Sequence, residues 1–124
     1  MSWQATVRSP VRVTFAHLAD PSRLGDWLPE VTGPVAPPAA TGEVFALTVG
    51  TGQRAVAAGG ELTAFEPPWL AGYRLFIGSW VVTLRVTCTA CAVGTQVRLH
   101  QSGDITLAVD LDRLANVLDQ GQMT

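Results

Sequence analysis

The chain has 124 residues, of which 48% are hydrophobic and only 15% are charged, and its formal net charge is −2 at pH 7. This length fits a single domain covering residues 1–124, and so apolar a composition excludes a disordered chain. Ten acidic residues outnumber eight basic ones, all of them arginine. A nucleic-acid-binding protein is therefore disfavoured, because neutralising phosphates needs a basic surface.

No stretch of the sequence has the length and composition of a membrane-spanning helix. The longest stretches without a charged residue, 31–42 and 86–97, are well short of the ~20 apolar residues that span a bilayer. The N-terminal residues also lack the basic and apolar regions of a signal peptide. We therefore expect a cytoplasmic protein that is not an integral membrane protein.

The N-terminal third of the chain predicts one strand and two short helices. Residues 3–7 alternate between apolar and polar side chains, the pattern of a half-buried strand. Ser9 followed by Pro10, and Asp20 followed by Pro21, each match a helix N-cap with proline at the first helical position. We therefore expect a helix to begin at each of these two pairs.

The rest of the chain predicts a series of antiparallel strands. The proline-rich segment 33–42 is typical of a surface loop. After it, four turn-forming segments separate five extended runs. These segments are Gly50-Thr51-Gly52, Glu66-Pro67-Pro68, Gly78-Ser79 and Cys91-Ala92-Val93-Gly94. If the third turn is tight, Leu75 lies opposite Val82 and Tyr73 lies opposite Leu84.

These strands are expected to share one apolar face and one polar face. The same counting places Val86 opposite Leu99 and Leu84 opposite Gln101. The apolar face then holds Tyr73, Leu75, Ile77, Trp80, Val82, Leu84, Val86, Cys88, Val97 and Leu99. The polar face carries Arg74, Arg85, Arg98 and His100, with Glu61 opposite Arg74. We read the arginines as a solvated surface, since exposed charges are ordinary there.

The face on which the earlier strands present their apolar residues stays open at this stage. Gly59-Gly60 could form a bulge that switches faces between Leu47 and Leu62. Such a switch would turn Arg54 towards the interior.

The chain closes with a predicted amphipathic helix. Its leucines have helical spacing. They are Leu107, Leu111, Leu114 and Leu118. Asp104 matches the N-cap of this helix, and Gly121 matches its end. A helix that follows a curved antiparallel sheet can cover the apolar face of that sheet, which gives a two-layer α+β domain.

The order of these elements and three motifs carry a family resemblance. The motifs are Phe15-Ala16-His17-Leu18-Ala19-Asp20-Pro21 with Trp27 and Pro29, then Glu66-Pro67-Pro68, then Gly94-Thr95-Gln96-Val97. From the first strand to the closing helix, the chain resembles the SRPBCC superfamily, the START and polyketide cyclase–dehydrase group with a helix-grip fold. The resemblance implies a hydrophobic cavity between the sheet and the closing helix, with no obligatory metal or organic cofactor.

The resemblance and the composition together predict which residues line that cavity. Small side chains on the strands would leave volume that a solid core would fill. They are Ala46, Ala57, Ala58, Gly60, Ala64 and Ala71. The predicted lining consists of Trp27, Tyr73, Leu75, Trp80, Val82, Leu84, Leu99, Gln101, Leu107 and Leu111. The alternative is a closing helix that lies closer to the sheet and leaves no cavity.

Candidate catalytic groups are few. No nucleophile motif occurs, and His17 and His100 fit surface positions better than catalytic ones. Among the inward polar groups, Tyr73 and Gln101 could orient a ligand, and Arg54 joins them only if the strands switch faces.

Cys88 and Cys91 form a CxxC pair, which elsewhere marks zinc or redox sites. Zinc needs four ligands and a redox pair favours a helix N-terminus, so we predict neither and expect no metal. Cys88 then reads as a small inward residue and Cys91 as part of a turn.

Three functions are consistent with these features. The favoured one is binding or carriage of a hydrophobic small molecule such as a lipid, quinone or polyketide. The first alternative is a cofactor-independent polyketide cyclase or dehydratase-like enzyme that guides cyclisation of a polyketide chain. The second is an interaction module that forms a homodimer through its apolar surface and binds no ligand.

Overall fold

A computed structural model describes residues 1–32, 42, 44–50 and 52–122. Its helices are α1 (Val11–Leu18), the 3-10 helices η1 (Pro21–Asp26) and η2 (Gly52–Arg54), and α2 (Leu111–Gln122). Its strands are β1 (Ser2–Val7), β2 (Val31–Thr32), β3 (Val44–Val49), β4 (Val56–Glu66), β5 (Leu70–Ile77), β6 (Trp80–Cys91) and β7 (Gly94–Gly103). The predicted proline-rich loop lies outside the described residues, apart from residue 42.

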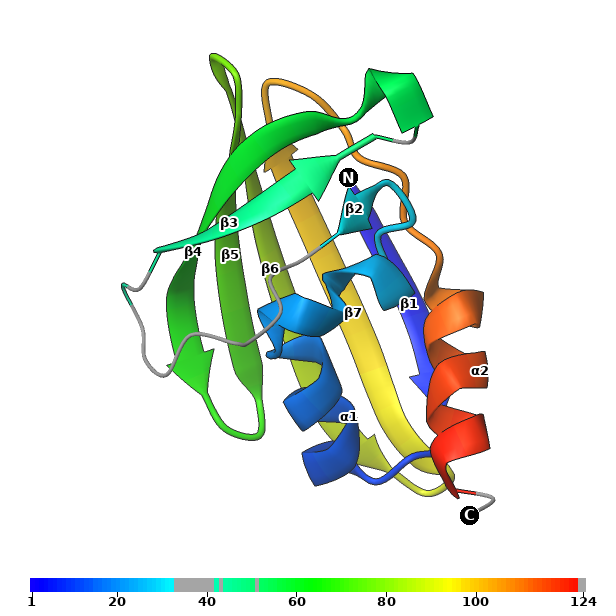
Figure 1. Cartoon of the computed structure of the whole chain (residues 1–124). Coiled ribbons are helices and arrows are strands. Elements are labelled where there is room, and N and C mark those ends of the chain that lie inside the picture. Colours follow the sequence, from blue (N-terminus) through cyan, green and yellow to red (C-terminus); the bar gives the residue numbers. More distant parts are fainter. Residues whose placement is uncertain (33–41, 43, 51, 123–124) are drawn as a thin grey trace.

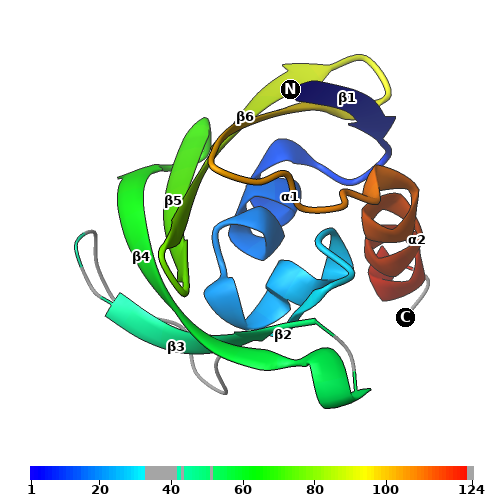
Figure 2. The ribbon, with the colours of Figure 1, turned by 90° about the horizontal axis from the view of Figure 1, so that it is seen from above.

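The strands form one curled antiparallel sheet in the order β1-β7-β6-β5-β4-β3-β2. Figure 1 shows this sheet bending around α1 and η1. Seen from above in Figure 2, these two helices lie within the curve, and α2 lies at the open side beside β1. The fold is therefore α+β and helix-grip-like, as the sequence predicted, with a short extra strand, β2, that the sequence did not predict.

The predicted strand registers at the centre of the sheet are confirmed. Leu75 pairs with Val82, and Tyr73 pairs with Leu84. In the next hairpin, Leu84 pairs with Gln101. Glu61 also lies opposite Arg74, with their charged groups 3.9 Å apart. Alternation and turn length were sufficient to fix this part of the fold, because one residue of slippage would turn every apolar side chain to the other face.

The possible bulge at Gly59-Gly60, which the sequence left open, is not formed. Gly60 pairs with Phe45 in an unbroken register, and the shift in β4 lies between Leu62 and Ala64. The strands therefore do not switch faces before Leu62. Gly60 is glycine for a packing reason, since a Cβ atom there would collide with the Phe45 ring.

The two N-terminal helices begin close to their predicted positions, with one difference in capping. The N-cap of α1 is Pro10 rather than Ser9, and no side chain caps this end of the helix. The carbonyl of Ser9 instead accepts hydrogen bonds from Thr14 Oγ1 at 3.2 Å and Thr95 Oγ1 at 2.8 Å. Asp20 caps η1 as predicted, accepting from the Ser22 amide at 3.0 Å.

The closing helix begins later than predicted. Leu107 lies in a segment without regular secondary structure, and the helix begins at Leu111 and continues to Gln122. Asp104 does not cap it, because its carboxylate accepts from the Val81 amide at 2.9 Å. Asp110 takes the capping position and accepts from the Arg113 amide at 2.9 Å.

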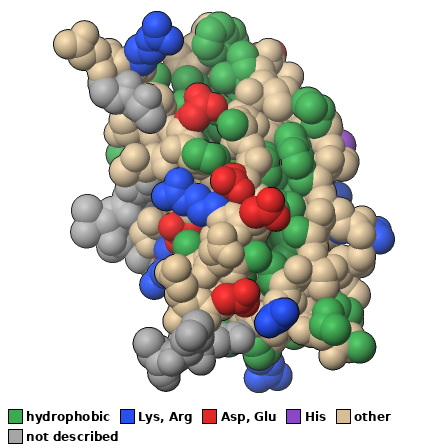
Figure 3. Space-filling view, turned by 90° about the vertical axis from the view of Figure 1, so that its right-hand side faces the viewer, with side chains coloured by type: hydrophobic (Ala, Val, Ile, Leu, Met, Phe, Trp, Pro, Cys, Tyr) green, Lys and Arg blue, Asp and Glu red, His purple; other side chains and the backbone are tan. Residues whose placement is uncertain are grey.

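The side chains exposed near α2 carry both signs of charge. Figure 3 shows this side of the molecule, where acidic, basic and hydrophobic side chains are interspersed. Within the described residues, no helix has the length and apolar character needed to cross a membrane.

Candidate functional site

The residues predicted to line an internal cavity are, with one exception, packed core residues. Those at most 8% exposed are Trp27, Tyr73, Leu75, Val82, Leu84, Leu99, Gln101, Leu107 and Leu111. All of them except Gln101 belong to one hydrophobic cluster that joins the sheet to the helices. The concave side of the sheet is occupied by α1 and η1, while α2 packs against β1 and η1 (Figure 2).

Trp80 is the exception, and its predicted place in the interior is wrong. It pairs with Ile77 and has the same strand alternation as Val82. As the first residue of β6, however, it lies at the end of the sheet next to the turn, and 51% of its surface is exposed. The alternation was predicted correctly, but it does not ensure burial of the first residue of a strand, even though Ile77 opposite it is buried.

The small residues on the strands do not create the expected volume. Ala46 and Ala57 lie on the exposed side of the sheet. Next to Gly60, the ring of Phe45 fills the space that the glycine leaves, and it meets Tyr73 edge-on at 6.4 Å between centroids. At Gly60 the small residue therefore accommodates a neighbouring ring.

The polar groups considered for catalysis hold parts of the fold together. The Tyr73 hydroxyl donates to the carbonyl of Leu18 at 2.7 Å. Burial, with a smaller contribution from the charge of Asp20, raises the pKa of Tyr73 well above its usual value. The Gln101 amide donates to the carbonyl of Leu107 at 3.1 Å, and its oxygen accepts from the amide of the same residue at 2.5 Å.

Arg54 lies away from both of these groups. It is exposed at the end of η2, outside the strands of the sheet. The switch of faces on which an inward Arg54 depended does not occur, so Arg54 does not join the inward polar groups. The structure does not bring the three catalytic candidates together.

Trp27 carries an unpaired donor inside the core. Its side chain is fully buried, with its ring 6.3 Å from that of Tyr73 between centroids. Its indole nitrogen has no hydrogen-bond acceptor among the described residues. A buried N–H without a partner costs free energy, so this position is a local weakness of the packing.

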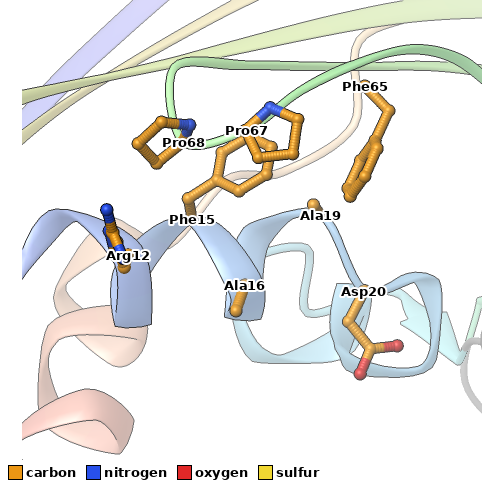
Figure 4. Close-up of a pocket in the computed structure, with 8 residues that line it drawn as sticks. All are labelled: Arg12, Phe15, Ala16, Ala19, Asp20, Phe65, Pro67 and Pro68. Atoms are coloured by element: carbon orange, nitrogen blue, oxygen red, sulfur yellow. The ribbon is translucent and has the colours of Figure 1, made fainter.

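A groove suited to an apolar ligand opens elsewhere, between α1 and the turn that joins β4 to β5. Its volume is about 610 Å³. One wall is formed by α1 and the residues after it, and the other by Phe65, Pro67 and Pro68 (Figure 4). The rings of Phe15 and Phe65 lie 5.6 Å apart between centroids, which ties the two walls together.

The geometry of α1 explains why its side chains share this groove. Arg12, Phe15, Ala16 and Ala19 have the three- and four-residue spacing of a single helical face. Phe65 lies opposite Ala71, whose side is the buried side of the sheet, so the ring of Phe65 points towards α1. The two alanines leave the space between the walls open.

His17 lies on another face of α1, and its predicted surface position is wrong. Only 8% of its side chain is exposed, and its Nε2 atom lies 2.7 Å from Oδ2 of Asp26. A second groove, of about 550 Å³, runs past it between α1 and α2. His100 is exposed as predicted, with Nδ1 3.1 Å from the hydroxyl of Ser2.

The two cysteines have different environments. Cys88 is buried, and burial raises the pKa of its thiol to about 12, which makes it a poor nucleophile or metal ligand. Cys91 is exposed at the end of β6. Within the described part of the chain, no three His, Cys, Asp or Glu side chains are grouped to hold a metal ion.

The sequence contained the groove residues but gave them other roles. Phe15 belongs to a motif of the family resemblance, and Pro67 and Pro68 to a predicted turn. Alternation counted from Glu61 places Phe65 on the polar face, and only the register shift between Leu62 and Ala64 turns it to the buried side opposite Ala71. Its aromatic partner there is Phe15 on α1. Which helix supplies that partner depends on tertiary packing rather than on a local pattern.

Comparisons with known proteins support the fold. No protein-family model matches the chain, and no curated protein matches it. Protein SA2116 from Staphylococcus aureus, of unknown function, aligns over 100% of this chain and 95% of its own, with a TM-score of 0.74 and 9% identity. DR_A0006 from Deinococcus radiodurans aligns over 98% and 95%, with a TM-score of 0.72 and 16% identity.

A third similar structure comes from a biosynthetic locus. DynU16, described as a putative protein in the dynemicin biosynthetic locus, aligns over 98% of this chain with a TM-score of 0.70 and 22% identity. This chain corresponds to only 47% of the length of DynU16. At these identities the comparisons establish the curled-sheet, helix-grip-like fold of this chain.

Proposed function

We propose that this protein binds a hydrophobic small molecule in the groove between α1 and the β4–β5 turn, and that it is a member of the SRPBCC superfamily. The observation that carries the binding proposal is the groove itself. Its volume of about 610 Å³ lies within the ~300–1,000 Å³ typical of ligand sites. Its walls are mainly phenylalanine, proline and alanine, with a few polar groups at the edges.

The proposed role is that of a binder or carrier rather than an enzyme. Tyr73 and Gln101, the polar groups best suited to assist a reaction, are engaged with the backbone of Leu18 and Leu107. Neither lines the groove. The similarity to DynU16 supports a ligand related to small-molecule biosynthesis, since that protein is placed in a biosynthetic locus.

A titration with a neutral hydrophobic dye, Nile red, tests this proposal. Phe65→Ala removes one aromatic wall of the groove, so we expect its Kd for the dye to rise about tenfold. Phe76→Ala is the matched control, because Phe76 is also a partly exposed phenylalanine in the sheet but does not line the groove. We expect the control to bind within twofold of the wild type.

Two results would contradict the proposal. One is equal weakening in Phe65→Ala and Phe76→Ala, which would indicate non-specific binding to exposed rings. The other is no saturable binding of the dye to the wild type.

A further inference from the structure

The groove contains two charged side chains, and one of them is already satisfied. Oδ1 of Asp20 accepts hydrogen bonds from the Ser22 amide at 3.0 Å and the Ser22 hydroxyl at 2.6 Å. Oδ2 of the same carboxylate lies 3.5 Å from Nε of Arg23. A carboxylate with these partners has little need of a cation from a ligand.

Arg12 is in the opposite situation. Arg12 lines the groove, and its guanidinium takes part in none of the ion pairs found among the described residues. It also lies in the first turn of α1, where no acidic residue and no side-chain cap offset the positive end of the helix. The groove therefore has one uncompensated positive charge, at its Arg12 end.

The distance along α1 sets the size of the apolar part of a ligand. Arg12 and Ala19 are seven residues apart, which corresponds to about 10 Å along a helix. Over this distance the opposite wall is apolar, from Pro68 near Arg12 to Phe65 near Ala19 (Figure 4). A ligand that fits both features has an apolar body of this length and an anionic group at one end.

We propose that the groove selects an amphipathic carboxylate, with its apolar body between Phe15 and the β4–β5 turn and its carboxylate paired with Arg12. This inference rests on the proposed function and adds the ligand class to it. A guanidinium is well suited to such a group, because its parallel N–H bonds match the two oxygens of a carboxylate.

Decanoate and decan-1-ol form a matched pair of ligands, since they share a chain length and differ in charge. Their affinities are measured at pH 8 by displacement of Nile red from the wild type, Arg12→Gln and Arg113→Gln. Arg113 is exposed on α2 and does not line the groove, so its variant makes the same change in net charge elsewhere. We expect Arg12→Gln to weaken decanoate about fivefold, as for an exposed ion pair, and to leave decanol within twofold.

Added salt provides a second measurement. It should reduce the difference between wild type and Arg12→Gln for decanoate, because an exposed ion pair is screened. Equal effects of Arg12→Gln and Arg113→Gln on decanoate would overturn the inference and leave the proposed function standing. Displacement by decanol but not by decanoate would likewise overturn only the inference. Failure of both ligands to displace the dye from wild type would overturn the proposed function, and the inference with it.

Discussion

At the scale of single residues, Tyr73 and Trp27 show how the interior was misjudged from the sequence. Both were predicted to face a ligand, because aromatic side chains with a polar atom often orient one. In the structure the two rings are neighbours. The Tyr73 hydroxyl donates a hydrogen bond to the Leu18 carbonyl, whereas the Trp27 N–H has no acceptor among the described residues. Their type and parity could be predicted, but the partner of each polar atom could not.

This contrast predicts different stabilities for two conservative variants. Tyr73→Phe leaves the buried Leu18 carbonyl without its donor, and we expect it to lower the free energy of unfolding by about 1–2 kcal/mol. Trp27→Phe creates a small cavity but removes an unpaired N–H, so we expect a change within about 1 kcal/mol. Urea denaturation measures both. A greater loss in Trp27→Phe than in Tyr73→Phe would contradict this view of the interior.

Two buried groups predict a loss of stability at alkaline pH. Burial raises the pKa of Cys88 from 9.0 to about 12, and burial with the charge of Asp20 raises the pKa of Tyr73 from 10.0. A raised pKa in the folded state means that stability is fully present below pH 9 and falls as the unfolded chain ionises above it. We expect a slope of up to about 1.4 kcal/mol per pH unit for each group.

Tyr73 is the only tyrosine in the chain, so its ionisation can be followed by the absorbance of tyrosinate. That absorbance should increase only as the protein unfolds. Tyr73→Phe should remove the part of the slope that begins near pH 10 and keep the part that begins near pH 9. Ionisation of Tyr73 near pH 10 in the folded protein would contradict its burial.

At the scale of elements, the hairpins were predictable and the start of the last helix was not. The turns and the alternation of the central strands fixed their register, because each strand buries only one face. The leucine spacing that predicted a helix includes Leu107, although this residue lies in an irregular segment that is hydrogen-bonded to Gln101. A buried leucine at helical spacing can thus precede the helix itself.

The observed cap gives a test of where α2 begins. Asp110→Ala removes a hydrogen bond to the Arg113 amide and should lower the free energy of unfolding by about 1 kcal/mol. Asp112→Ala is the control, since Asp112 is exposed within the first turn and only its weaker interaction with the helix dipole is lost. Thermal or urea denaturation measures the free energy of unfolding of both variants. An equal decrease in Asp110→Ala and Asp112→Ala would contradict Asp110 as the N-cap.

At the scale of the whole molecule, the fold class followed from the order of the elements, while the site depended on their arrangement. The sequence predicted a curved sheet, two short helices and a closing helix, all of which are present. It placed a cavity beneath the closing helix, whereas α1 and η1 lie within the curve of the sheet and α2 lies beside β1 (Figure 2). How three helices share one concave face depends on packing between distant segments, which local periodicity does not encode.

An amide NMR titration with decan-1-ol shows whether a ligand occupies the groove between α1 and the β4–β5 turn. We predict that chemical-shift changes concentrate at residues that line the groove, namely Arg12, Phe15, Ala16, Ala19, Asp20 and Phe65. Changes centred on Trp27 and Leu111 instead would place the ligand beneath the closing helix and contradict its proposed position in the groove. An unchanged spectrum at saturating decanol would contradict ligand binding altogether.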